Sequence, residues 1–169
     1  MFLAEKDLIC TIGEAFLSKQ GYDLARGLYA HGINGRGEAL PIKTQELMIE
    51  RLKSSKILTA LINSFIANAT GYTFYEEGSV HFIPEGEDLE DCDHDLYYAI
   101  QHANYIISGV RHNGGWAVTV TIWDTYDFDH IRLIEKVGFA NAANDLGWSM
   151  QQAGMMTPYE FSVTYTIFI

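Results

Sequence analysis

The chain has 169 residues, of which 48% are hydrophobic, 13% aromatic and 20% charged. This length and composition predict one folded domain over residues 1–169 with a packed core, and they exclude a disordered chain. The formal net charge of −11 argues against a nucleic-acid-binding protein, because such proteins gather Lys and Arg along the phosphate backbone. The same charge argues against electrostatic adsorption to anionic membranes.

The N-terminal part of the chain has the apolar spacing of helices. Apolar residues recur at helical intervals in 8–16, 24–31 and 44–69. The third segment is interrupted near Ser54 and Ser55, which predicts two helices in place of one.

Beyond Gly71 the spacing changes to that of strands. Residues 72–75 and 80–83 flank Glu-Glu-Gly, which predicts a hairpin, and the acidic run 85–95 predicts a surface loop. Two further strand-like runs, 105–110 and 116–123, flank an Asn-Gly pair, which is a strong hairpin signal.

The C-terminal part has one more helical segment, 139–153, and ends on a strand of alternating apolar residues, 161–169. The fold class expected from all these segments is therefore α+β. N-terminal helices precede a curved antiparallel sheet or open β-barrel with one inserted helix. No stretch has the roughly 18 uncharged apolar residues of a membrane span, so we expect no transmembrane segment.

The densest polar cluster, 124–132, begins where a predicted strand ends. Its candidate catalytic residues are Asp124, Tyr126, Asp127, His130 and Arg132. A carboxylate can hold a divalent cation, an imidazole can transfer a proton, and a guanidinium can grip phosphate oxygens. The cluster therefore suits phosphoester chemistry. From composition alone, a solvated loop with packed rings and an ion pair is the more frequent arrangement.

The other polar residues give weaker signals. The group Cys92, His94 and His102 matches no common zinc-site spacing. His81 and His112 fall in predicted hairpins, where we expect them at the surface.

Two segments together resemble the colicin M family, bacteriocins that degrade lipid II. The run Asp124-x-Tyr126-Asp127-Phe128, after a Trp-containing strand, resembles the active-site signature of that family. The run Ala-His-Gly-Ile-Asn-Gly-Arg-Gly at 30–37 is similar to the segment that opens its catalytic domain. The two segments lie in the same order at a comparable separation, and the resemblance covers about residues 21–169.

The resemblance implies a hydrolase, a phosphodiesterase that cuts lipid II between the polyprenol and the pyrophosphate and so blocks peptidoglycan biosynthesis. Family members need a divalent cation, usually Mg²⁺, act at the periplasmic face of the membrane, and are neutralised by a cognate immunity protein. Asp124 would be the principal catalytic carboxylate. Asp127 and Tyr126 would position the metal, the water or the phosphate, which makes Asp124 and Asp127 the metal-ligand candidates.

The N-terminus has no visible signal peptide. The resemblance therefore implies an antibacterial toxin that is made in the cytoplasm and delivered to the periplasm of the target cell. The chain has no room for the receptor-binding and translocation regions of colicin M. We expect a secretion machine to inject it, or the domain to be one piece of a larger toxin.

The sequence departs from the family pattern in its last two motif residues. Family members place His-Arg after five residues, whereas here His130 follows after two and Arg132 after four. Two alternatives therefore stay open. The chain is a catalytically silent relative that serves as a protein-interaction module, or it is an unrelated toxin or an acidic, immunity-type binder.

Overall fold

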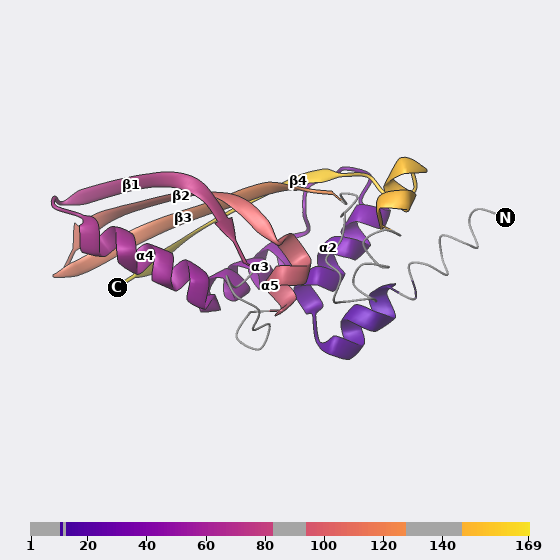
Figure 1. The fold of residues 1–169 in the computed structure, drawn as a ribbon, viewed down its shortest axis with the longest axis horizontal. Coiled ribbons are helices and arrows are strands. Elements are labelled where there is room, and N and C mark those ends of the chain that lie inside the picture. The colour runs from indigo at the N-terminus through magenta and orange to yellow at the C-terminus, as the bar shows by residue number, and fades with distance from the viewer. Residues whose placement is uncertain (1–10, 12, 83–93, 128–146) are drawn as a thin grey trace. The chain divides into compact units, whose positions relative to one another are not determined.

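The computed structural model describes residue 11 and residues 13–82, 94–127 and 147–169 (Figure 1). The chain divides into two compact units. Unit 1 consists of Met1–Pro41 and Thr125–Phe161, and unit 2 of Ile42–Asp124 and Ser162–Ile169.

Three helices of unit 2 are described: α3 (Ile42–Ser54), α4 (Lys56–Asn68) and α5 (His94–Ile100). The break between α3 and α4 confirms the interruption predicted from the serine pair. Ser55 has an extended backbone, and its hydroxyl accepts a hydrogen bond from the Leu58 amide at 3.3 Å. This bond satisfies one of the free amides at the start of α4, so the serine ends one helix and begins the next.

Four strands form one sheet in the order β1 (Thr73–His81), β2 (His102–His112), β3 (Gly115–Tyr126) and β4 (Tyr159–Phe168). All neighbouring strands are antiparallel, and the sheet is not closed into a barrel. β2 and β3 form the hairpin predicted from Asn-Gly. Asn113 and Gly114 have φ angles of 50° and 88°, a left-handed backbone that this pair of residues adopts readily.

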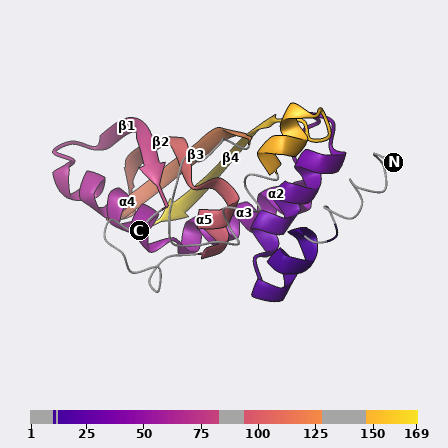
Figure 2. The same cartoon turned by 45° about the vertical axis from the view of Figure 1, so that its right-hand side comes forward.

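The core of unit 2 lies between one face of the sheet and the helices. Figures 1 and 2 show α4 running along this face, while the opposite face carries no described helix of the unit. Alternate residues of the strands are buried, as expected for a sheet covered on one side. They include Ala103, Tyr105, Ile107, Val118, Val120, Ile122, Val163 and Tyr165. On the open face, threonine hydroxyls pair between β3 and β4, Thr121 with Thr164 at 2.9 Å and Thr119 with Thr166 at 3.2 Å.

Unit 1 contains a helix at 13–20, helix α2 (Asp23–Asn34) and a short helix at 147–152. A buried cluster holds them together and consists of Tyr29, Ile33, Met150 and Met156, with Leu17 and Met155 packed against it. The backbone also joins the segments, since the Thr157 amide donates a hydrogen bond to the Gly32 carbonyl at 3.0 Å.

The α+β class, with helices before an open antiparallel sheet, is confirmed. Two local predictions were wrong. Residues 72–83 form no hairpin, because Glu76, Glu77 and Gly78 continue β1 and pair with residues of β2. The second concerns 94–100, which forms α5 where the sequence predicted only a loop ending at residue 95. The rest of that loop and most of the predicted helix 139–153 lie outside the described residues. No described helix is both long and apolar enough to cross a membrane.

Candidate active site

Asp124 lies near the C-terminal end of β3, in unit 2. Ile122, two residues earlier in the strand, is fully buried, whereas the Asp124 side chain is 20% exposed. The apolar alternation of β3 therefore holds this carboxylate at the rim of the core, where water still reaches it. The sequence predicted that the strand ends at residue 123, whereas β3 continues to Tyr126, so Asp124 lies within the strand and not after it.

His102 begins β2 beside this end of β3, and the chain is fixed just before it. Gln101 has a left-handed backbone with φ of 38° and ends α5, its amide bonding to the Tyr97 carbonyl at 3.1 Å. The Gln101 carbonyl in turn accepts a hydrogen bond from the amide of Phe82 at 2.7 Å. The Phe82 side chain is buried. These bonds hold the start of β2 on both sides.

α5 itself is held to α3 by a buried carboxylate. Asp95 is 3% exposed, and its Oδ2 lies 3.2 Å from Nε of Arg51. Because an ion pair of this kind is costly to break once one partner is out of water, α5 has a defined position on α3. Because β2 follows α5 directly, the position of α5 also fixes the start of β2.

The consequence is a carboxylate–imidazole pair, His102 with Asp124. The Nε2 atom of His102 lies 3.7 Å from Oδ2 of Asp124. This distance exceeds a direct hydrogen bond, yet it is short enough for the carboxylate to attract a protonated imidazole. The His102 side chain is 56% exposed, so the pair is open to solvent on the imidazole side.

A second imidazole lies against the first. His81, at the end of β1, is the cross-strand partner of His102. The two rings stack with centroids 5.7 Å apart and planes 26° apart. Stacking restricts the rotation of His102 about its side-chain bonds and leaves its nitrogen atoms at the ring edge.

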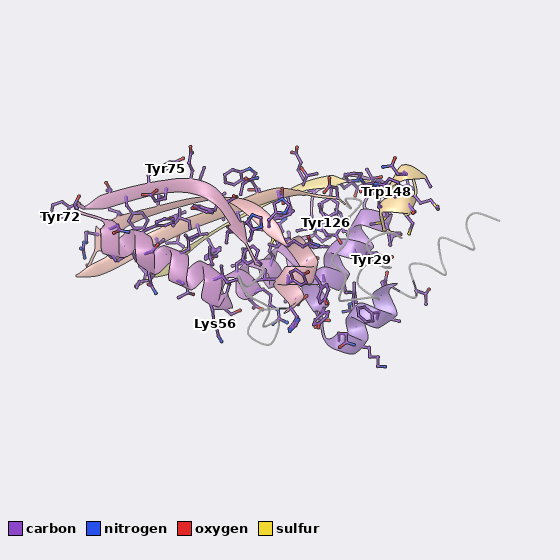
Figure 3. The ribbon with its side chains drawn as sticks, in the orientation of Figure 1. Tyr29, Lys56, Tyr72, Tyr75, Tyr126 and Trp148 are labelled. Atoms are coloured by element: carbon purple, nitrogen blue, oxygen red, sulfur yellow. The ribbon has the colours of Figure 1, made fainter. Side chains whose placement is uncertain are left out.

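Tyr126 ends β3 and belongs to unit 1, where its ring has a packing role. It stacks on Tyr159 with centroids 5.2 Å apart, and Figure 3 shows it beside Tyr29 of α2. Burial, and to a lesser degree the neighbouring Tyr29, raises the pKa of Tyr126 far above its ordinary value of 10.0. The side chain therefore stays a neutral phenol even in alkaline solution, able to donate a hydrogen bond but not to act as a base.

The two segments that carry the family resemblance meet within unit 1. A β-carbon at Gly32 would lie 2.9 Å from Cε of Met156 and 3.5 Å from Cε1 of Tyr126. The glycine is thus what lets α2 approach these side chains. His31, one residue earlier, bonds through Nε2 to the Glu38 carbonyl at 2.9 Å and packs its ring edge on Tyr159. These contacts give His31 a structural role at the end of α2.

The remaining predicted residues are placed less fully. Asp127 follows β3 directly in unit 1 and is exposed, while His130 and Arg132 lie outside the described residues. No group of three or more His, Cys, Asp or Glu side chains suited to a metal ion occurs in the part of the chain that the structure describes. Asp124 and His102 alone do not make a magnesium site, which needs about six oxygen ligands. Any such ion would take further oxygens, for example those of a pyrophosphate.

Apart from Ile42 of α3, the large exposed apolar side chains of unit 2 gather at the other end of the sheet. They are Tyr72, Tyr75, Val110, Phe168 and Ile169, near the β2–β3 turn and the chain end. These side chains lie towards the His112 end of β2, whereas the His102–Asp124 pair lies at the opposite end of that strand. They are not part of the candidate site.

His102 is not among the residues that the sequence predicts for the site, because it lies outside the cluster 124–132. The hairpin predicted from the sequence nevertheless indicates that His102 lies close to Asp124. With the turn at Asn113 and Gly114, antiparallel pairing brings residues just before 103 alongside those just after 124. The pairing of Asn104 with Trp123 fixes that register.

The fold and the pair define an α+β protein with a carboxylate and an imidazole at one end of an open antiparallel sheet. The chain matches no family model, no curated protein and no solved structure.

Proposed function

We propose that the protein is an antibacterial toxin that hydrolyses lipid II between the polyprenol and the pyrophosphate. The observation that carries the proposal is the His102–Asp124 pair, 3.7 Å apart at the solvent-open end of the sheet. Hydrolysis of a phosphoester requires proton transfer at the reacting oxygens. A carboxylate beside an imidazole can accept and donate protons there.

The geometry of unit 1 supports the link to the colicin M family. The resemblance depends on two segments that are distant in sequence, 30–37 and 124–132. Gly32 of the first lies against Tyr126 of the second. Because residues of the two segments contact each other, the joint occurrence of both motifs supports the resemblance more strongly than either motif alone.

In the proposed reaction, Asp124 is the principal catalytic carboxylate. Tyr126, a neutral phenol, and Asp127 orient the water or the phosphate. Arg132 binds phosphate oxygens, as the family pattern implies. The pyrophosphate of the substrate brings Mg²⁺ as its counter-ion, and the metal neutralises phosphoryl charge when bound. We propose that an immunity protein protects producer cells, as in the resembling family.

The site of action provides the first test. The chain is expressed in a susceptible bacterium with and without an added export signal. Because lipid II exposes its pyrophosphate-linked sugar at the periplasmic face, we expect lysis only when the protein is exported. Unimpaired growth with exported, folded protein would contradict the proposal.

The same experiment tests the residue assignment. Asp124→Ala is expected to abolish lysis, whereas Asp23→Ala, which removes an exposed carboxylate paired with Arg26 on the surface of α2, is expected to lyse cells normally. Full toxicity of folded Asp124→Ala would show that the site lies elsewhere.

A further inference from the structure

We propose that His102 is the general acid of this hydrolysis, donating a proton to the polyprenol oxygen as it leaves phosphorus. The inference rests on the proposed function and assigns the proton transfer to a histidine outside the segment that resembles the colicin M signature. The structure supplies the assignment through the juxtaposition of His102 with Asp124 and His81.

The chemistry of the leaving group sets the requirement. Polyprenol is an alcohol, and its alkoxide is so basic that the P–O bond breaks readily only if a proton reaches the oxygen. A protonated imidazole meets this need near neutral pH. Nε2 of His102 faces the Asp124 carboxylate at 3.7 Å, so the other ring nitrogen is the one positioned to reach the substrate.

The step balances without an added reactant. The oxygen of a water molecule forms a bond to the phosphorus next to the polyprenol, and the bond from that phosphorus to the polyprenol oxygen breaks. The bonding electron pair stays on the leaving oxygen, which takes the proton of His102 and departs as the alcohol. The attacking water loses one proton to the solvent, and the solvent returns a proton to the imidazole.

The surroundings of His102 suit a residue that must hold one orientation. Its backbone follows Gln101, which is bonded both to α5 and to Phe82. Its ring is stacked on His81 and faces Asp124. At 56% exposure it remains accessible to a large amphipathic substrate. His81 is therefore a positioning residue in this assignment.

The decisive test compares two substrates that differ in one atom. One is lipid II, and the other is an analogue with sulfur in place of the oxygen that bridges the polyprenyl chain and phosphorus. A thiolate leaves without protonation, so loss of a general acid slows only the oxygen substrate. We expect His102→Gln to lower cleavage of lipid II by about a hundredfold or more, and cleavage of the sulfur analogue by no more than about threefold.

His112→Gln is the matched control. His112 ends the same strand, lies at the surface by the β2–β3 turn and is remote from the pair. It should leave both rates unchanged. Near-UV circular dichroism checks that both variants are folded.

The other outcomes test the general-acid assignment and the proposed function separately. Equal loss on both substrates, or no loss on either, would overturn the general-acid assignment while cleavage by the wild type upholds the proposed function. A leaving-atom effect in His130→Gln and not in His102→Gln would assign the acid to His130. Wild-type protein that cleaves lipid II but spares the sulfur analogue would place the broken bond elsewhere and overturn the inference. Wild-type protein that cleaves neither substrate would contradict the proposed function itself.

Discussion

The ring of Tyr126 stacks on the ring of Tyr159, with centroids 5.2 Å and planes 28° apart. The contact joins the end of β3 to the start of β4 inside unit 1. Tyr159 is anchored in turn, since its hydroxyl donates a hydrogen bond to the Leu28 carbonyl of α2 at 3.0 Å. A tyrosine of the segment that resembles the colicin M signature thus contributes to the packing of unit 1.

Removing the Tyr126 ring should therefore destabilise the protein more than removing its hydroxyl. We expect Tyr126→Ala to lower the free energy of unfolding by about 3 kcal/mol, through loss of packing. Tyr126→Phe should lower it by about 1 kcal/mol or less. Tyr75→Ala, which truncates an exposed tyrosine of β1, is the control and should cost less than about 1 kcal/mol. Urea unfolding measures all three, and equal losses for the Ala and Phe variants of Tyr126 would contradict this packing.

Alkaline pH should weaken the fold through its buried phenols. Burial is the main cause that raises the pKa values of Tyr126, Tyr159 and Tyr165 above the ordinary 10.0. In the unfolded chain these phenols ionise near 10.0, while in the folded protein they stay protonated. Their contribution to stability is therefore complete below about pH 9 and is lost as the pH rises from about 10 towards the folded pKa values.

The measurement is the free energy of unfolding in urea at several pH values from neutral to strongly alkaline. We expect a plateau followed by a decline above about pH 10. Tyr159→Phe, which removes one such phenol, should make the decline shallower. A decline of equal slope in wild type and variant would show that Tyr159 does not contribute.

The pairing of β3 with the chain end should tolerate no side chain at Gly115. Trp116 and Ile169 exchange two backbone hydrogen bonds, of 2.6 Å and 2.9 Å. A β-carbon at Gly115 would overlap the Ile169 carbonyl oxygen, which is backbone and has little freedom to move. We expect Gly115→Ala to cost about 2 kcal/mol.

Gly71→Ala is the matched control for that substitution. The nearest atoms to a β-carbon at Gly71 lie at 3.9 and 4.0 Å, which is ordinary contact. The substitution should change the free energy of unfolding by no more than about 0.5 kcal/mol. If both alanine variants unfold at the wild-type urea concentration, the terminal pairing does not contribute to stability.

Local chemistry allowed several elements to be predicted from the sequence. Ser55 provides a helix cap within three residues of the amide it bonds. Asn113 and Gly114 accept the left-handed backbone that a tight hairpin needs. Both signals act over a few residues, so the sequence contains them in full.

The features that the sequence did not predict involve residues whose partners are distant along the chain. Gly78 looked like a turn residue, but it lies opposite Tyr105 in β1–β2 pairing, and a β-carbon there would lie 2.8 Å from the Tyr105 hydroxyl oxygen. The glycine provides room for a ring from another strand, which local composition does not reveal. The same holds for His102, whose partner Asp124 is adjacent only after β2 and β3 have paired.

The most direct test of the central claim is chemical. Purified protein is incubated with lipid II, with and without Mg²⁺, and the lipid and soluble products are separated by chromatography. We predict polyprenol together with the pyrophosphorylated disaccharide-peptide in the presence of the metal, and no products from Asp124→Ala. Intact lipid II after long incubation at high protein and metal concentration would contradict the account and would favour a protein-interaction module.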